Sequence, residues 1–521
     1  MNREHFLKKA EDRDVLWDIV VIGGGATGLG AAVDAMSRGY QTLLLEQDDF
    51  AKGTSSRSTK LIHGGVRYLR QGNVALVAEG LRERGLLLRN APHLVHDRPF
   101  VVPTYNRWQG ALYATGLKVY DALAGRLSMG SSRFLSRAQT SEAIPNLAAQ
   151  DLRGGVLYHD AQFDDARLAI SLVQTLAEGG GTPLNYMKVS ELLKRSGRIS
   201  GVRAIDIETC RAYEIRARAV INATGAFGGE IMQMDASAAT PLLTLSQGIH
   251  LVLDRDFLGG DAALMVPRTD DGRVLFAIPW LEKVVLGTTD TPVTGASLEP
   301  QPLPGEVDFL LAHAGRYLTR VPGRADVRAV FAGLRPLLKP PSARRTAAIA
   351  RDYAVTISPS GLVTVTGGKW TIYRRMGEAA INAAVDVGRL ERRPSSTAVS
   401  RLHGWIDSVD RADPLSVYGS DGPAIRDWIK ARPDFGQLLH PRLPYLKAQV
   451  VWGARHELAR TVEDILARRT RCLFLDARAS MEAAPAVAEL LGPELGRDTA
   501  WQQAQVRAFS ALARRYQLQA S

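Results

Sequence analysis

The chain has 521 residues, of which 45% are hydrophobic and 23% charged, values typical of a soluble globular protein of about three domains at roughly 150 residues each. Cys210 and Cys472 are the only cysteines, too few for a disulfide framework or a multi-cysteine metal site, so we expect a reducing compartment and no metal. The formal net charge is +11, and a basic surplus is compatible with nucleic acid, an anionic membrane surface or anionic ligands.

The first elements form a β-α-β unit. Residues 18–22 (DIVVI) are apolar and β-branched after the aspartate, which predicts a short buried strand. Residues 29–38 are rich in alanine and precede a glycine, which predicts a helix, and residues 42–45 (TLLL) predict a second buried strand. Units of this kind build parallel sheets, so the sequence predicts an α/β fold.

The turn between the first strand and the helix is glycine-rich, with the sequence GGGATG at residues 23–28. In a dinucleotide fingerprint, Gly23 permits the tight turn, Gly25 lets the backbone approach a pyrophosphate, and Gly28 lets the helix pack against the strand. Glu46 follows the second strand, where a carboxylate can accept hydrogen bonds from an adenosine ribose. The segment predicts a dinucleotide site and leaves NAD and FAD open.

Two further segments favour FAD. Residues 53–65 (GTSSRSTKLIHGG) are small and rich in hydroxyl groups, and they present many donors to a long, extended cofactor. An NAD-binding domain would usually continue with another β-α-β repeat. Later in the chain, the turn Gly367-Gly368-Lys369 opens a helix, whose positive end can face the flavin pyrimidine and stabilise the anion of the reduced ring.

The middle of the chain has weaker local signals. Residues 163–165 can cap a helix, which has an apolar face and is ended by the glycines at 179–181; that face consists of Leu168, Leu172, Val173 and Leu176. Strand-like pieces follow around residues 202–207, 213–215 and 219–222.

The second half first becomes strand-rich and then helical. Short strands from residue 248 to residue 290, with a hairpin at 270–272, predict an antiparallel sheet inserted into the α/β domain. Residues 363–365 predict another buried strand, and residues 372–387 predict a helix. After an expected linker at 392–396, the chain is predicted to be mostly helical.

Nine spaced motifs resemble those of FAD-dependent glycerol-3-phosphate dehydrogenases of the aerobic, respiratory type. They lie at residues 63–69, 91–93, 164–168, 222–225, 278–280, 287–290, 333–336, 351–353 and 367–371. Residues 455–459 and 463–471 resemble the helical C-terminal domain of that family. The resemblance covers nearly the whole chain in order, and it implies a glutathione-reductase-like FAD-binding domain, an inserted antiparallel-sheet substrate cap and a C-terminal helical domain.

The same resemblance implies how the domains divide the chain. The FAD-binding domain is expected in three parts, at residues 1–85, 151–235 and 331–392. The substrate cap is expected in two parts, at residues 86–150 and 236–330. The C-terminal helical domain is expected at residues 397–521.

The residues of the site are also carried over from the family's motifs. Arginine suits a phosphate dianion, because its guanidinium can form two parallel charge-assisted hydrogen bonds. The expected substrate-binding residues are Arg67, Tyr68, Arg335 and Arg351, and the expected catalytic residues are His250, His63, Lys369 and Arg335. The expected FAD-binding residues are Gly23, Gly25, Gly28, Glu46, Thr54, Ser55, Ser58, His63, Gly64, Gly65, Val189, Thr224, Gly225, Gly368, Lys369 and Thr371.

The base of the reaction stays open at this point. Oxidation of a hydroxyl group needs a base for its proton; His250 matches a family histidine near the substrate, and His63 matches one near the flavin. An arginine or lysine near the hydroxyl could instead stabilise an alkoxide. Gln247 and Ile249 stand where lysine and serine are expected, and Trp370 stands where a smaller apolar residue is usual.

The resemblance implies oxidation of sn-glycerol 3-phosphate to dihydroxyacetone phosphate by hydride transfer to FAD, with electrons passed to a membrane quinone. A glycerophosphate oxidase that reduces oxygen to hydrogen peroxide is an alternative on the same fold, and a related amine or amino-acid oxidase is a more distant one. No aromatic-interleaved basic patch or zinc-ligand spacing supports a nucleic-acid-binding flavoprotein, so no nucleic-acid partner is expected. A homodimer is compatible with the sequence.

The expected location follows from the absence of targeting signals. No apolar run reaches the roughly 18 residues that a membrane span needs, and the N-terminus lacks the apolar core of a signal peptide. We therefore expect a cytoplasmic protein that lies peripherally on the inner face of a bacterial cell membrane, held by its charge on an anionic surface.

Overall fold

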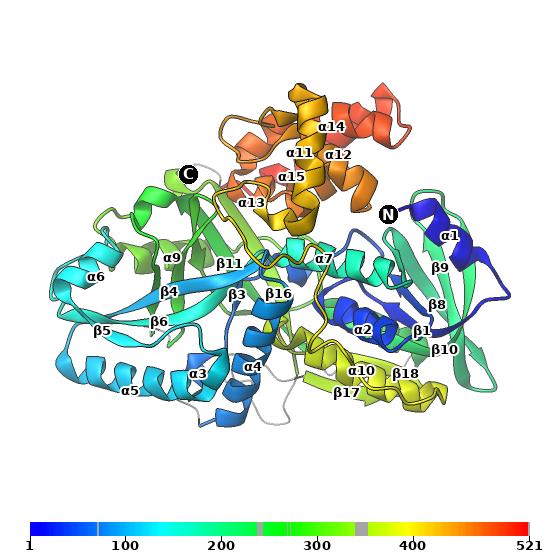
Figure 1. Ribbon diagram of the computed structural model, residues 1–521, viewed down its shortest axis with the longest axis horizontal. Coiled ribbons are helices and arrows are strands. Elements are labelled where there is room, and N and C mark those ends of the chain that lie inside the picture. The colour runs from blue at the N-terminus through cyan, green and yellow to red at the C-terminus, as the bar shows by residue number, and fades with distance from the viewer. Residues whose placement is uncertain (70–71, 237–242, 268, 271, 339–352, 519–521) are drawn as a thin grey trace.

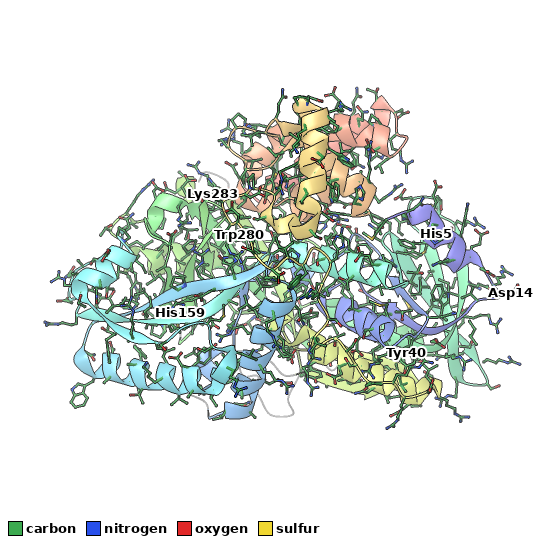
Figure 2. The ribbon with its side chains drawn as sticks, in the orientation of Figure 1. His5, Asp14, Tyr40, His159, Trp280 and Lys283 are labelled. Carbon is green, nitrogen blue, oxygen red and sulfur yellow. The ribbon has the colours of Figure 1, made fainter. Side chains whose placement is uncertain are left out.

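The structure is a computed structural model that describes residues 1–521 apart from 70–71, 237–242, 268, 271, 339–352 and 519–521. It has three packed parts (Figure 1): a first sheet with its helices on the right, a second sheet with its helices on the left, and the C-terminal helices above them. In Figure 2, Tyr40 marks the first part and His159 the second, and Trp280 lies where the second sheet meets the C-terminal helices.

The first sheet has the strand order β17-β18-β10-β1-β2-β7, and β9 and β8 extend it from β10. The strand β1 lies in its middle and pairs in parallel with both β2 and β10. The strands are β1 (Leu16–Ile22), β2 (Thr42–Leu45), β7 (Thr182–Leu184), β8 (Met187–Arg195), β9 (Arg198–Asp206), β10 (Ala212–Asn222), β17 (Tyr353–Ile357) and β18 (Leu362–Gly367).

Three helices pack beside one another on this sheet, and α2 lies between α7 and α10 (Figure 1). They are α2 (Ala26–Ser37), α7 (Asp165–Glu178) and α10 (Tyr373–Gly388). Two glycines let α2 and α10 approach closely, since a Cβ on Gly30 would lie 2.7 Å from the Tyr373 carbonyl oxygen and one on Gly377 would lie 2.4 Å from the Gly30 carbonyl carbon.

The predicted local elements of this part are confirmed. The strand–turn–helix–strand unit is β1, α2 and β2, and the predicted second strand has the observed bounds. Asp164 caps α7, where its side chain accepts hydrogen bonds from the backbone N–H groups of Ala166 and Arg167. The strand and helix predicted near residues 363–365 and 372–387 are β18 and α10.

One predicted division of this sheet is wrong. Residues 213–215 and 219–222 belong to a single strand, β10. Its first half pairs antiparallel with β9 and its second half pairs in parallel with β1. Arg216 and Arg218 are exposed on one face of this continuous strand, and their polarity interrupts the apolar run that the sequence shows.

The second sheet has the strand order β15-β11-β14-β13-β12-β4-β6-β3; β16 pairs with β11, and β5 pairs with β6. Its pairings are antiparallel except that of β12 with β4. The predicted hairpin joins β12 to β13, although Asp271 at its tip lies outside the described residues. The strands are β3 (Leu61–Ile62), β4 (Val95–Thr104), β5 (Arg133–Ser136), β6 (Gly154–Phe163), β11 (Leu243–Asp254), β12 (Ala263–Val266), β13 (Leu275–Trp280), β14 (Lys283–Gly287), β15 (Thr291–Val293) and β16 (Ala329–Leu338).

The membership of this sheet differs from the predicted domain boundaries at two places. The strand β6 follows residue 151 and pairs along its whole length with β4, so it belongs to the second sheet and not to the first. The strand β16 runs past residue 331 and pairs with β11 over ten residues. A strand's sheet is decided by its hydrogen-bonded neighbours, which the sequence pattern of the strand does not show.

The remaining helices pack on one of the two sheets or form the C-terminal part. Two of them contact the first sheet: α1 (Arg3–Glu11) packs against β7 and β10, and α8 (Gly228–Asp235) packs against β8, β10 and β18. The other described helices are α3 (Val66–Leu69), α4 (Val74–Asn90), α5 (Arg107–Ala124), α6 (Arg137–Ala143), α9 (Pro304–Gly315), α11 (Gly422–Ala431), α12 (Lys447–His456), α13 (Cys472–Leu475), α14 (Ala477–Glu494) and α15 (Thr499–Arg514). The expected linker at 392–396 has no helix or strand. It is nevertheless anchored, because Arg393 Nη1 donates to the Gly39 carbonyl oxygen at 3.1 Å.

Candidate active site

A long cavity lies at the carboxyl ends of the parallel strands of the first sheet and extends to the second sheet. The turns after β1, β2, β10 and β18 line one side of it, and β11 and β16 line the far end. In open α/β sheets, ligands bind in the crevice at the carboxyl ends of the strands. The fold therefore places the predicted dinucleotide turn and one predicted substrate residue, Arg335, in one cavity.

The glycine turn has the close approaches that the fingerprint requires. Gly23 has a φ of +110°, and a Cβ there would lie 2.6 Å from the Ala223 carbonyl oxygen. A Cβ on Gly28 would lie 1.9 Å from the Gly23 carbonyl oxygen, so only glycine lets α2 start this close to the turn. Gly25 is the N-cap of α2 and lines the cavity, which leaves the helix N-terminus open to an anion.

Glu46 lies beside this turn, as predicted. Its Oε2 accepts a hydrogen bond from the Gly24 N–H at 2.6 Å, and its Oε1 accepts one from the Asp48 N–H at 2.9 Å. Burial raises the pKa of Glu46 to about 7. The carboxylate both holds the turn and lines the cavity, where it can accept from a ribose hydroxyl group.

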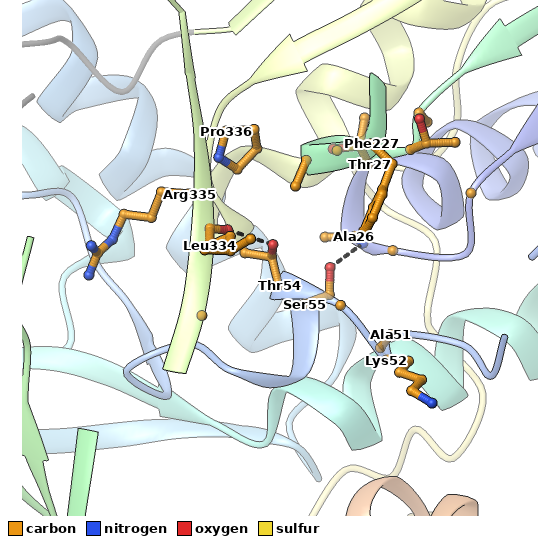
Figure 3. A pocket seen from close by; sticks show the side chains of 18 of the residues that line it. Ala26, Thr27, Ala51, Lys52, Thr54, Ser55, Phe227, Leu334, Arg335 and Pro336 are labelled. Atoms are coloured by element: carbon orange, nitrogen blue, oxygen red, sulfur yellow. Dashed lines mark hydrogen bonds between the residues drawn. The ribbon is translucent and has the colours of Figure 1, made fainter. Parts of the chain in front are cut away.

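The hydroxyl-rich segment contributes two residues that connect the sheets across the cavity (Figure 3). Ser55 Oγ accepts from the Ala26 N–H at 2.9 Å, and Thr54 Oγ1 donates to the Leu334 carbonyl oxygen at 2.6 Å. Trp370 closes the same contact from a third element, because its Nε1 donates to the Ser55 carbonyl oxygen at 2.8 Å. Tryptophan at position 370, where a smaller apolar residue was expected, therefore helps to hold the segment that contains Thr54 and Ser55 in place.

Other predicted cofactor residues also line this cavity. His63, Val189, Thr224, Gly225, Gly368, Lys369 and Thr371 are among its lining residues. Gly367 and Gly368 have φ values of +80° and +83°, and a helix begins directly after them, as the sequence predicts. The donor set, the glycine cradle and the helix N-terminus fit an extended dinucleotide such as FAD.

Three predicted cofactor residues are placed differently. Ser58 lines the cavity, but its hydroxyl donates to Asp165 Oδ2 at 2.7 Å. The N–H of Gly64 donates to the Tyr120 hydroxyl at 2.8 Å, behind the cavity. Gly65 lines a smaller adjoining cavity.

The smaller cavity adjoins the first at Thr59, Leu61 and His63, which line both. Tyr68 also lines it, and Lys369 Nζ lies 5.5 Å from the centre of the Tyr68 ring. Arg351 lies outside the described residues, and so does the side chain of Arg67.

Arg335 is oriented by the segment after β14. Its Nη1 donates to the Thr289 carbonyl oxygen at 3.1 Å and its Nη2 donates to Thr288 Oγ1 at 3.0 Å. Asp290 Oδ1 lies 3.6 Å from Nη1. Figure 3 shows the guanidinium extending from β16, and Arg335 lines the same cavity as the glycine turn.

His250 is buried at the same end of the cavity, with 2% of its surface exposed. Its Nε2 lies 2.9 Å from Thr59 Oγ1, and its ring stacks on Phe331 with 4.8 Å between the ring centres. Its Nδ1 has no hydrogen-bond partner among the described residues. Burial, with smaller contributions from Arg335 and Lys60, holds the pKa of His250 well below 6.5, so the imidazole is neutral near pH 7.

The structure brings in two residues that sequence reasoning missed. Thr59 shares the hydrogen bond with His250, and no sequence pattern distinguishes it from its serine neighbours. Glu306 accepts from Thr289 Oγ1 at 2.7 Å and from Gln247 Nε2 at 2.8 Å. The glutamine that departs from the expected lysine thus supplies a neutral donor to a buried carboxylate.

The buried imidazole predicts an acid-sensitive stability. An unfolded histidine has a pKa of about 6.5 and takes up a proton that His250 in the fold does not take up. The contribution of His250 to the free energy of unfolding should therefore be constant above pH 6.5 and should decrease as the pH falls below 6.5. His250→Gln should lower this dependence by up to about 1.4 kcal/mol per pH unit, as measured by denaturant unfolding at pH 7.5 and 5.5.

His403→Gln is a control of opposite sign. Burial would lower the pKa of His403, but Asp421 and Glu178 outweigh it and raise the pKa. The contribution of His403 to the free energy of unfolding is largest below pH 6.5 and is lost as the pH rises. His403→Gln should therefore lower the free energy of unfolding more at pH 5.5 than at pH 7.5. An unchanged pH dependence in His250→Gln would contradict a neutral buried imidazole.

Two family models match most of the chain. Residues 18–374 match a model described as FAD dependent oxidoreductase, and residues 395–505 match one described as the C-terminal domain of alpha-glycerophosphate oxidase. The chain is 40% identical over 519 residues to a protein of Macaca fascicularis named Glycerol-3-phosphate dehydrogenase, mitochondrial. That alignment covers 92% of this chain and 71% of the relative.

Two solved structures resemble this chain over different shares of its length. The glycerol-3-phosphate dehydrogenase from Bacillus halodurans, complexed with FAD, matches with a TM-score of 0.81 at 28% identity and covers 100% of this chain and 99% of its own. The L-proline dehydrogenase from P. horikoshii matches with a TM-score of 0.56 at 14% identity. It covers 73% of this chain but 95% of its own, and this more distant likeness shows the fold alone.

Proposed function

The chain belongs to the family of FAD-dependent glycerol-3-phosphate dehydrogenases, and from this premise we propose that it oxidises sn-glycerol 3-phosphate to dihydroxyacetone phosphate. The observation that carries the proposal is that Arg335, His250 and Lys369 line the same cavity as the glycine turn. An arginine that can bind an anion, a neutral histidine that can act as a base, and the glycine turn that can bind a cofactor thus line one cavity. FAD, when bound, supplies the acceptor for the hydride that leaves C2 of the substrate.

The residues of this chain have separate parts in the proposed reaction. Arg335 binds the phosphate, since its guanidinium is oriented from behind by Thr288 and Thr289. His250 accepts the proton of the C2 hydroxyl at Nε2 through the hydroxyl group of Thr59, which lines both cavities. Lys369 contributes positive charge beside the reacting hydroxyl. Arg67 and Arg351 stay predicted substrate residues.

The electron acceptor is the second part of the proposal. We propose a membrane quinone, as the family resemblance implies. An oxygen-reducing glycerophosphate oxidase is the second candidate, because residues 395–505 match a domain described from such an oxidase. Anaerobic turnover with a soluble quinone analogue should exceed turnover with oxygen and should yield dihydroxyacetone phosphate. Equal turnover with oxygen and formation of hydrogen peroxide would favour the oxidase, and no turnover of the substrate with either acceptor would contradict the proposed function.

The proposed quinone requires contact with a membrane, and α5 presents a face that suits one. None of the helices in the described part of the chain is long and apolar enough to span a bilayer. On α5, Trp108, Leu112 and Val119 are 86%, 67% and 47% exposed, and their spacing places them on one face. Phe134 on the neighbouring β5 is 62% exposed, and Lys118 lies on the same helix.

A helix with this composition binds in the interface of an anionic bilayer, because tryptophan and leucine enter the headgroup region while lysine stays outside. Figure 1 places α5 on the side of the second sheet that faces away from the C-terminal helices. We propose that this face of α5 binds the membrane. The location on the cytoplasmic face of a bacterial membrane stays a prediction.

Trp108→Asp combined with Leu112→Asp should reduce membrane binding. Each buried apolar side chain contributes roughly 1.5–3 kcal/mol, so the partition coefficient to anionic phospholipid vesicles should fall by about 100-fold or more. Co-sedimentation with the vesicles measures this. Val399→Asp is the matched control, because Val399 is 75% exposed but lies in the segment between α10 and α11. Equal binding by the double variant and the control would contradict the assignment of this face.

A further inference from the structure

The cofactor segment from residue 54 to residue 60 has two sides. On one side, Thr54, Ser55 and Thr59 line the cavity. On the other side, the carbonyl oxygen of Ser56 and the side chain of Lys60 are buried away from the cavity. The positions of Thr54, Ser55 and Thr59 in the cavity therefore depend on the contacts that Ser56 and Lys60 make in the interior.

A buried group of charges holds it, and one member comes from the C-terminal part. Lys60 Nζ donates to the Ser56 carbonyl oxygen at 2.8 Å and to Asp165 Oδ2 at 2.7 Å. Arg471 Nη2 donates to the same two groups, to the Ser56 carbonyl oxygen at 2.7 Å and to Asp165 Oδ1 at 3.2 Å. The side chains of Lys60, Asp165 and Arg471 have 0% exposure.

Two basic side chains face two carboxylates in this group, and Arg471 Nε lies 3.8 Å from Asp164 Oδ1. Burial lowers the pKa of Lys60 to about 7, so Arg471 supplies the permanent positive charge. Loss of Arg471 would leave a net negative charge in a buried place, which is costly unless the backbone moves to admit water. The cofactor segment contacts this charge directly, because Ser58 donates to Asp165 through both its N–H and its hydroxyl group.

Aromatic rings from two parts of the fold surround these cations. Lys60 Nζ lies 5.2 Å from the ring centre of Phe331 and 5.4 Å from those of Trp280 and Phe474. The Arg471 guanidinium lies 4.3 Å from the ring centre of Phe474. Figure 2 shows Trp280 at this junction of the second sheet and the C-terminal helices. The rings exclude water, which strengthens the charge interactions inside.

A second contact from the same C-terminal stretch reaches the loop after β2. Arg469 donates to Asp49 Oδ2 and Oδ1 at 2.6 and 2.8 Å. Glu463 Oε2 accepts from Lys52 Nζ at 3.3 Å. The residues between them include the single turn of π-helix Asp464–Arg469, a rare conformation that is found frequently at functional sites. Residues 463–471 therefore contact two of the segments that line the cofactor cavity, the loop after β2 and residues 54–60.

We propose that the C-terminal helical part serves to hold the FAD-binding loops in their binding conformation, and that Arg471 is the positioning residue that couples it to residues 54–60. Arg471 does not touch the cavity; it acts through the Ser56 carbonyl and Asp165. The inference rests on the assignment of the cavity to FAD and does not depend on the identity of the substrate.

Arg471→Met tests this coupling, and Arg167→Met is its matched control. Arg167 also forms a buried ion pair with the C-terminal part, since its guanidinium donates to both carboxylate oxygens of Glu457 at 2.9 and 2.7 Å. Within the described part of the chain, neither side chain of that pair has a hydrogen bond to residues 46–60; its link to the loop after β2 is indirect, because Arg167 Nη1 also donates to the Arg469 carbonyl oxygen at 3.5 Å. The dissociation constant of FAD from each apoprotein is measured by quenching of flavin fluorescence, and the thermal midpoint of each is measured separately.

Arg471→Met should weaken FAD binding about 10-fold or more, as the loss of a charge-assisted contact implies. Arg167→Met should lower the thermal midpoint but change FAD binding by less than about threefold. Arg471→Lys, which keeps the charge and loses the planar donor geometry, should fold in any case, and it should show intermediate affinity together with an altered visible circular dichroism band of the bound flavin.

The outcomes separate the claims. Equal FAD affinity in Arg471→Met and Arg167→Met overturns the coupling, as does a wild-type flavin spectrum and affinity in Arg471→Lys where the methionine variant fails to fold. A wild-type chain that binds no FAD overturns the cofactor assignment and the inference with it. Normal FAD binding without turnover of sn-glycerol 3-phosphate overturns only the proposed function and leaves the coupling supported.

Discussion

Gly25→Val should leave the chain folded and without bound FAD. Gly25 is the N-cap of α2 with φ −86° and ψ −176°, an extended backbone conformation that a β-branched residue adopts without strain. A Cβ there would lie 2.9 Å from Ser55 Oγ, so the valine side chain would occupy the space between the helix N-terminus and Ser55. A cofactor pyrophosphate needs that space to reach the backbone N–H groups.

The measurement is the FAD released on denaturation per mole of protein, with far-ultraviolet circular dichroism to check the fold. Gly305→Ala is the control, because a Cβ at Gly305 would meet nothing within 4 Å. The control should keep its full complement of FAD. Near-stoichiometric FAD in Gly25→Val, or release of FMN from the wild type, would contradict the placement of the pyrophosphate at this turn.

Arg335→Ala should raise the KM for sn-glycerol 3-phosphate roughly 10- to 150-fold, the equivalent of a lost charge-assisted contact of about 1.5–3 kcal/mol. FAD should stay bound, because Arg335 lies on β16 at the end of the cavity away from the glycine turn. Arg335→Lys should recover only part of the loss. An ammonium group lacks the planar guanidinium that Thr288 and Thr289 orient.

Steady-state kinetics with the quinone analogue measure this effect, together with the flavin content of each variant. Arg324→Ala is the control, because Arg324 pairs with Asp308 on the surface of the same part of the fold. Wild-type KM in Arg335→Ala would show that the phosphate is bound elsewhere. A loss of flavin in Arg335→Ala would show instead that the residue acts on the cofactor.

Local elements were predictable because short-range interactions decide them. The strands around the glycine turn are continuous apolar runs. Asp164 caps a helix through hydrogen bonds to backbone N–H groups only two and three residues further along the chain. The positive φ of Gly23 and Gly368 follows from turns that glycine alone adopts easily. The local patterns already favoured FAD, and the family resemblance added the substrate and the order of the domains, which those patterns left open.

Long-range contacts were not predictable in the same way. His250 and Thr59 are 191 residues apart in the chain, and only the tertiary structure brings their side chains within 2.9 Å of each other. The partners of Ser58 and Gly64 were also not predictable, and the sequence assigns both residues to the cofactor. In the structure, Ser58 donates to Asp165 and Gly64 donates to Tyr120, and both acceptors come from distant elements.

The sequence by itself determined the parallel sheet, the dinucleotide turn and the helical C-terminus, because periodicity, capping and glycine placement are properties of neighbouring residues. Only the tertiary structure decided the continuity of β10, the sheet to which β6 and β16 belong, and the buried contacts of Arg471. Arg471 is separated from Ser56 by 415 residues, and in the sequence it is one arginine among many. Burial beside two carboxylates distinguishes it, since a charge removed from water must find its partners in the fold.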